Sequence, residues 1–188
     1  MQEGFDAGNV TSLQAMSSRA KSRDLGLIVI SGLLVGAGAF LIDRLIKVWV
    51  MQGTIRQGPV FFSWMEVTRH QNSGLLGDWP LPGWLIVILS AAALGLLGYG
   101  LYEALVHERG WDLVALCLVL GGALGNLYDR LAYGYVFDWL MFFKTSIVNG
   151  ADIMITVGLV VYVALHLRKK PNMDVDCQVQ PTNANHIS

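Results

Sequence analysis

Charged residues are scarce in this chain of 188 residues, of which only 14% are Asp, Glu, Lys or Arg. The formal net charge is −1, and the absence of a basic surplus argues against a nucleic-acid partner, which requires a basic face. Cysteine is nearly absent as well. Cys117 lies in an apolar run and Cys177 near the C-terminus, without metal-ligand spacing, so we predict no disulfide and no metal site on them. Apolar residues, by contrast, make up 54% of the chain.

Four segments are long and apolar enough to cross a bilayer, for which a helix needs about 20 residues. The first begins near Leu25, and its apolar run with Ala37 and Ala39 also has the pattern of a cleaved secretory signal peptide. The run is longer than a usual signal core and continues in a helical pattern to Trp49, which favours a retained membrane helix. We therefore predict spans at residues 25–49, 81–102, 111–128 and 148–167.

The stretch between the first two spans, residues 51–78, has a different character. Strand-forming residues are interrupted there by Gly58 and Pro59, a pattern that indicates a hairpin. Because Phe62 and Trp64 would be costly to expose to water, we expect this small sheet at the membrane interface. The predicted fold class is an all-α membrane protein with four transmembrane helices and a small β-hairpin between the first two.

Polar tails flank the predicted membrane domain. We expect residues 1–24 and 171–188 to be disordered and residues 25–170 to form the domain. Basic residues cluster beside both tails, and an even number of spans places both termini on one side of the membrane. Since basic residues favour the cytoplasmic side, we predict that both termini are cytoplasmic.

Polar side chains gather where the spans reach the opposite boundary. Asp43 and Lys47 lie four residues apart on one helix face, as an ion pair or, alternatively, with the lysine extending to the headgroups. Counting back from the basic end of the fourth span places Asp152 about one turn inside the apolar slab. An acid in that position is a functional hypothesis by default. We expect six more polar residues to lie at the same boundary: Asn72, Asn126, Asp129, Arg130, Asp138 and Asn149.

Two of these acids, Asp138 and Asp152, have no basic residue beside them, whereas Asp129 precedes Arg130 and is expected to pair with it. If two carboxyl groups face each other closely, both cannot be ionised, and one is protonated at neutral pH. Such a pair can hold a water, deprotonate it for attack on a carbonyl and protonate the leaving amine. The alternative is that these acids cap helix starts and pair with Arg130 and Lys144.

Five blocks of the sequence resemble, in the same order, the bacterial lipoprotein signal peptidase family, also called signal peptidase II. They are DRLIK (43–47), NSG (72–74), GGALGNLYDR (121–130), VFDWL (136–140) and NGAD (149–152). The resemblance covers about residues 25–168. It implies a four-helix membrane protein with a periplasmic β-cradle. The implied reaction is hydrolysis of prolipoproteins just before a diacylglyceryl-modified cysteine, without a metal or other cofactor.

By that resemblance, Asp138 and Asp152 are the catalytic dyad of an aspartic endopeptidase. The expected partners are prolipoproteins and membrane lipid, and we expect a monomer in the cytoplasmic (inner) membrane with its active site at the periplasmic face. Three departures from the family pattern are NSGLLG at 72–77, Val148 in place of phenylalanine, and residues 1–24, which extend beyond the family's usual start. The first two bear on the substrate groove, and neither touches a proposed catalytic acid. Supporting roles are implied for Asp43, Lys47, Asn72, Gly74, Asn126, Asp129, Arg130 and Asn149.

A different class of function is a small transporter or proton relay, because intramembrane acids also mark ion paths. This hypothesis predicts polar residues that continue down the spans, but the fourth span offers only Thr156 and Tyr162 below Asp152. A further alternative is an inactive relative that only binds lipidated peptides, and the intact acids argue against it.

Overall fold

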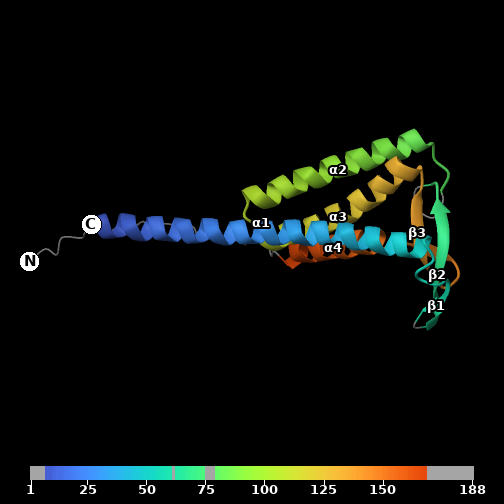
Figure 1. Cartoon of the computed structure of the whole chain (residues 1–188). Coiled ribbons are helices and arrows are strands. Elements are labelled where there is room, and N and C mark those ends of the chain that lie inside the picture. The colour runs from blue at the N-terminus through green and yellow to red at the C-terminus, as the bar shows by residue number, and fades with distance from the viewer. Residues whose placement is uncertain (1–6, 61, 75–78, 169–188) are drawn as a thin grey trace, which may run out of the picture.

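The computed structural model describes residues 7–60, 62–74 and 79–168, with the backbone alone for residues 7–23 and 168. The predicted C-terminal tail, residues 171–188, lies outside this part of the chain. Four helices run alongside one another, and the strands gather at one end of them (Figure 1). In chain order the described elements are α1 (Ala7–Met51), β1 (Gly58–Val60), β2 (Phe62–Asn72), α2 (Gly83–Val106), α3 (Gly110–Tyr133), β3 (Val136–Phe142), β4 (Ser146–Val148) and α4 (Gly150–Arg168).

Within the described residues, four helices are long and apolar enough to cross a membrane, which confirms the predicted number of spans. The first span belongs to α1, which continues as one helix past Asp43 and Lys47, as the sequence pattern indicates. α1 begins at Ala7, so residues 7–24, which we expect from the sequence to belong to the N-terminal tail, are helical in the structure. The spans are Asp24–Met51, Gly83–Val106, Gly110–Tyr133 and Gly150–Leu167.

α3 is the central helix of the bundle. Of its span, 56% is buried, whereas between 6% and 17% of each of the other three spans is buried. It packs against α1, α2 and α4, and its buried residues include Asn126 and Asp129 near its C-terminal end. Polar groups on α3 can therefore reach partners on α1 and α4 without contact with lipid.

Glycines allow the backbones of neighbouring helices to approach α3 closely. A Cβ atom at Gly121 would collide with the carbonyl oxygen of Gly36 on α1, and one at Gly122 would lie 2.7 Å from the carbonyl oxygen of Ala151 on α4. Real Cβ atoms do not come this close to other atoms, so any side chain here would force the helices apart. Small residues at membrane helix contacts serve this purpose generally.

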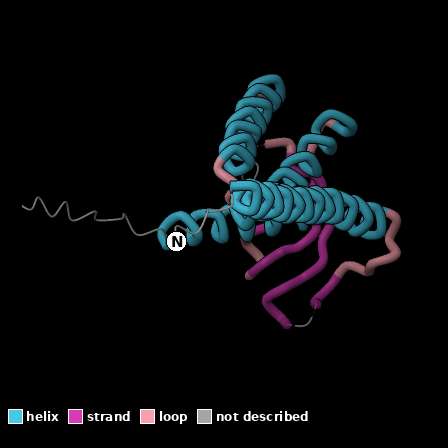
Figure 2. Tube along the Cα trace, turned by 90° about the vertical axis from the view of Figure 1, so that its left-hand side faces the viewer, coloured by secondary structure: helices cyan, strands magenta, loops and turns pink. Residues whose placement is uncertain are grey.

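The strands form one antiparallel sheet with the order β1-β2-β3-β4 in the described part of the chain. The predicted hairpin before α2 corresponds to β1 and β2, but β3 and β4, which connect α3 to α4, were not predicted. Val50 at the end of α1 packs with Val67 and Phe137 of the sheet, which fastens the sheet to the bundle. Viewed along the bundle, the strands lie together and extend beyond the helices (Figure 2).

The close contact between α1 and α3 makes Gly121 intolerant of any side chain. We expect Gly121→Ala to lower the free energy of unfolding by about 1–3 kcal/mol, the usual cost of overpacking. The matched control is Gly98→Ala on α2, where a Cβ meets no atom within 4 Å. Thermal unfolding of the two variants in detergent measures the difference, and equal melting temperatures would contradict the close approach of the two helices.

Candidate active site

The two acids that the sequence singles out come from different elements and line the same cavity. Asp138 lies in the middle of β3, opposite His70 of β2, and Asp152 lies in the first turn of α4. The cavity has a volume of about 450 Å³. Four other predicted site residues line it as well: Asn72, Asn126, Arg130 and Asn149.

The carboxyl group of Asp138 is 2% exposed and is held by two side-chain amides. Its Oδ2 accepts a hydrogen bond from Asn72 Nδ2 at 2.9 Å, and its Oδ1 accepts one from Asn149 Nδ2 at 2.6 Å. Burial raises the pKa of the Asp138 carboxyl above its ordinary value, and the nearby charge of Asp152 raises this pKa as well. The bonds from Asn72 and Asn149 favour the ionised form, but the net shift of the pKa remains upward.

Asp152 and Asn149 cap the start of α4 reciprocally. The backbone N–H of Asp152 donates to Asn149 Oδ1 at 3.0 Å, and the backbone N–H of Asn149 donates to Asp152 Oδ2 at 3.2 Å. This is the arrangement of a capping box, with Asn149 before the helix and an acid three residues later. Asp152 therefore does cap the start of α4, as the alternative interpretation of the acids predicts. Its other oxygen, Oδ1, faces α3 and accepts a hydrogen bond from Asn126 Nδ2 at 2.8 Å.

Asn149 therefore touches both acids. Its side-chain amide donates to Asp138, while its side-chain oxygen and its backbone N–H are used by Asp152. With both ends of the amide engaged, its orientation is determined. A single residue that is 0% exposed sets the position of Asp138 relative to α4.

A buried group of charges lies behind the cavity. Asp43, Lys47 and Asp129 are each at most 1% exposed. Lys47 Nζ lies 2.7 Å from Asp129 Oδ2 and 2.9 Å from Asp43 Oδ2, and Arg44 on the same helix pairs with both carboxylates. The pairing of Asp43 with Lys47 is confirmed and is internal, not on the surface.

The predicted partner of Asp129 was wrong. Asp129 is bound by Lys47 and Arg44 from α1, and no ion pair joins it to Arg130 among the described residues. Arg44 was not predicted as a site residue, although it immediately follows Asp43 in the sequence. The guanidinium of Arg44 lies over the aromatic ring of Tyr128 on α3, with its central carbon 5.0 Å from the ring centroid.

Lys47 also connects this group of charges to the cavity. Its Nζ donates to Asn126 Oδ1 at 3.2 Å, which directs the amide nitrogen of Asn126 toward Asp152. Asp43 Oδ1 accepts a hydrogen bond from the backbone N–H of Ala151 at 3.0 Å, so α1 also holds the start of α4 directly. Asp152 is therefore positioned by α1 through two separate contacts.

The remaining predicted site residues have distinct positions. The backbone N–H of Gly74 donates to Asn72 Oδ1 at 3.0 Å, which leaves the amide nitrogen of Asn72 directed at Asp138. Arg130 is half-buried, and its guanidinium is near enough to Asp152 and Asp138 to interact with their charges. Within the described chain, no group accepts a hydrogen bond from Arg130, and the residue lines the cavity instead.

Comparison with known proteins identifies this arrangement. Residues 35–168 match the family described as Signal peptidase (SPase) II. The chain belongs to the signal peptidase II family. It is 35% identical over 143 residues to a lipoprotein signal peptidase of Trichormus variabilis, covering 71% of this chain and 87% of the relative. It is also 33% identical over 157 residues to a lipoprotein signal peptidase of Latilactobacillus sakei, and this match covers 79% of this chain and 99% of the relative.

A solved structure supports the fold. A bacterial membrane enzyme determined by the in meso method at 2.3 Å resolution superposes with a TM-score of 0.66, over 77% of this chain and 92% of the other, at 22% identity. Membership of the signal peptidase II family, together with the four spans, makes the chain a multi-pass membrane aspartic peptidase of the inner membrane.

The charge of Lys47 balances two buried carboxylates, so its removal should be costly. Breaking a buried pair by deleting one partner costs about 3–5 kcal/mol, and we expect a loss of this size in the free energy of unfolding of Lys47→Met. Arg56→Met, at an exposed position, is the control and should change it by less than about 0.5 kcal/mol. Denaturant titration in detergent measures both; a Lys47→Met protein as stable as wild type would refute the buried pairing.

Proposed function

We propose that Asp138 and Asp152 are the catalytic dyad of a lipoprotein signal peptidase that cuts diacylglyceryl-modified prolipoproteins just before the modified cysteine. The observation that carries the proposal is the shared cavity, in which Asn149 holds both acids through uncharged amide and backbone groups. Structural acids of this chain, such as Asp43 and Asp129, are instead paired with Lys47. The two acids of the cavity remain available to a substrate.

Different surroundings assign different roles to the two acids. Asp138 is the group that holds a proton, because its burial and the charge of Asp152 raise its pKa. Asp152 is the proposed base, because it lies at the positive end of the α4 dipole and accepts hydrogen bonds from Asn126 and Asn149. Two carboxyl groups with environments that differ in this way are the usual arrangement for acid–base catalysis.

Hydrolysis follows from these roles. Asp152 takes a proton from water as the water oxygen attacks the scissile carbonyl carbon, and Asp138 gives its proton to the carbonyl oxygen. The tetrahedral diol then collapses. Asp152 donates its proton to the leaving amine of the modified cysteine, Asp138 recovers a proton from the diol, and the carbon–nitrogen bond breaks. Both acids return to their starting states, and the sum is one water consumed per peptide bond cut.

Arg130 is suited to hold the substrate. Its guanidinium lines the cavity beside both acids and offers several N–H donors to carbonyl oxygens. We assign it to substrate carbonyl groups near the scissile bond. The supporting residues behind the acids, Lys47 and Asn126, orient Asp152 and need not touch the substrate.

The same proposal includes location and assembly. Basic residues cluster at both ends of the chain, so we place both termini in the cytoplasm and the cavity at the periplasmic face. All of the site groups come from one chain, which supports activity as a monomer in contact with membrane lipid. Residues 25–170 form the peptidase domain under this proposal.

Substitution of either acid tests the dyad. We expect Asp138→Asn and Asp152→Asn each to lower kcat/KM on a diacylglyceryl prolipoprotein by roughly 10²–10⁴-fold, the range for general acid–base catalysis. Asp24→Asn, an exposed acid on α1, is the control for loss of a charge. Thermal unfolding confirms that the variants are folded, and wild-type cleavage by either dyad variant would end the proposal.

The pH dependence of cleavage tests the proton on Asp138. Because its protonated form acts, kcat/KM should fall as pH rises through its raised pKa. Asn72 donates a hydrogen bond that lowers this pKa, so Asn72→Ala should raise the pKa further and move the alkaline limb to higher pH. Gln71→Ala, at the exposed neighbouring position, should leave the limb in place. A limb that moves to lower pH in Asn72→Ala would assign the proton elsewhere.

A further inference from the structure

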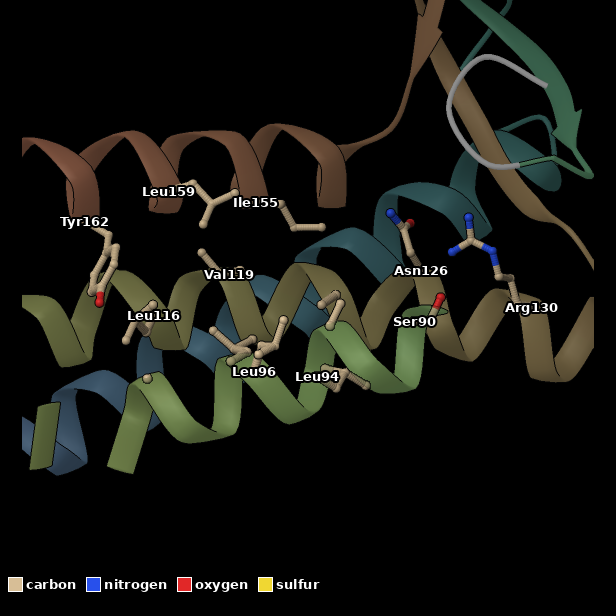
Figure 3. A pocket seen from close by; sticks show the side chains of 14 residues that line it. Ser90, Leu94, Leu96, Leu116, Val119, Asn126, Arg130, Ile155, Leu159 and Tyr162 are labelled. Atoms are coloured by element: carbon tan, nitrogen blue, oxygen red, sulfur yellow. The ribbon is translucent and has the colours of Figure 1, made fainter. Parts of the chain in front are cut away.

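A second cavity continues from the active site down through the bundle. It has a volume of about 450 Å³ and lies between α2, α3 and α4. Asn126 and Arg130 line both cavities, and Tyr162 lies at the opposite end of this one (Figure 3). Tyr162 is ten residues beyond Asp152 on α4, so the groove runs about 15 Å from the acids at 1.5 Å per residue.

The lining of this groove changes along its length. Near the active site it offers polar groups, from Ser90, Asn126 and Arg130. Below them the walls are apolar, with Ile155 and Leu159 on α4. Room between the walls comes from small residues on the facing helices: Ala93, Gly100 and Ala123.

The size of the groove distinguishes between the apolar parts of the substrate. An α-helix with side chains is about 10–12 Å wide, so a 15 Å length of it occupies more than about 1,000 Å³. The space in the groove is about 450 Å³. An extended hydrocarbon chain is much narrower than a helix, so it fits this space more readily than a helical signal segment does.

The polar end of the groove fits the linkage of such a chain. A diacylglyceryl group carries ester carbonyls, which only accept hydrogen bonds, directly above its hydrocarbon. Arg130 and Ser90 are donors at that level, and the guanidinium of Arg130 has no acceptor within the described residues. A helical peptide presents few free carbonyl groups, because its own N–H groups use them.

Tyr162 is fixed in place from below. Its ring contacts the ring of His166 with centroids 4.4 Å apart, and its carbonyl oxygen lies 3.2 Å from His166 Nδ1. His166 Nε2 lies 3.0 Å from an Arg109 nitrogen, and Arg109 also approaches the buried Asp112 at the start of α3. The ring of Tyr162 also packs against the cluster of Ala104, Leu113, Leu116 and Cys117.

We propose that the groove holds one acyl chain of the diacylglyceryl group and that Tyr162 is the residue that limits the length of chain accepted. The inference rests on the proposed function, since that function supplies the lipidated substrate. An acyl chain that enters the groove leaves lipid tails that are as apolar as the groove walls. Its transfer therefore adds little preference for one acyl chain over another. Selectivity arises where a chain that is too long meets the tyrosine ring.

The first test measures kcat/KM on lipopeptides with acyl chains shorter than, equal to and longer than the groove. With wild type, kcat/KM falls by roughly fivefold or more for the longest chains, as expected of an overpacked site. Tyr162→Ala moves this limit to longer chains, and Ala93→Leu moves it to shorter ones. Tyr162→Phe keeps the ring and the limit. Tyr102→Ala, an exposed tyrosine on α2, is the matched control. The same dependence on chain length in all variants overturns the proposal.

The second test does not depend on cleavage, so it separates failure of the groove from failure of the proposed function. Asp138→Asn protein is irradiated with one of two lipopeptides, which carry a photoreactive group either at the acyl terminus or in the signal segment. Attachment of the acyl label to the α4 segment with Leu159 and Tyr162 supports the proposal even if wild type cleaves no lipopeptide. Attachment of the signal-segment label there, or of the acyl label only outside the groove, overturns it.

Discussion

The contact between Lys47 and two buried carboxylates is the constraint on which the rest of the site depends. It joins α1 to α3 through Asp129, and Asp43 in turn binds the backbone of α4 at Ala151. Buried ion pairs are weak evidence for stability, because desolvation offsets much of the attraction. Their effect here is positional: three helices can satisfy these charges in one arrangement. Gly125 allows it, since a Cβ there would lie 2.8 Å from Asp43 Oδ2.

Helix capping and acid–base chemistry use the same atoms at the start of α4. A capping box stabilises a helix start with an acid at its third position, and Asp152 is that acid. Because the cap fixes the carboxyl group, the proposed base does not move when a substrate arrives. Asn149 extends this rigidity to Asp138 on the sheet, so the relative position of the two acids is set by short local contacts and not by the distant loops.

Counting spans predicted that the acids gather at one boundary, because span length and charge determine which end of a helix each residue occupies. The same reasoning could not identify β3 and β4. The block VFDWLMF is buried over much of its length and shows no polar alternation, and the turn after it places Phe143 and Lys144 at positive φ without glycine or asparagine. The sequence also could not show whether Asp129 pairs with Arg130 or with Lys47 and Arg44. The partner of Asp129 depends on which face of α3 meets α1.

The distribution of polar groups below the acids separates hydrolysis from ion transport. A proton path would need groups that exchange protons along the bundle. The hydroxyl of Thr156 donates to the carbonyl oxygen of Asp152 within α4, and the cavity side then continues with Ile155 and Leu159. Tyr162 lies beyond this apolar length, at the end of the groove opposite Asn126 and Arg130. The acids are therefore separated from the other side of the membrane by a hydrocarbon-lined space, which suits a lipid-linked substrate and interrupts the passage of a proton.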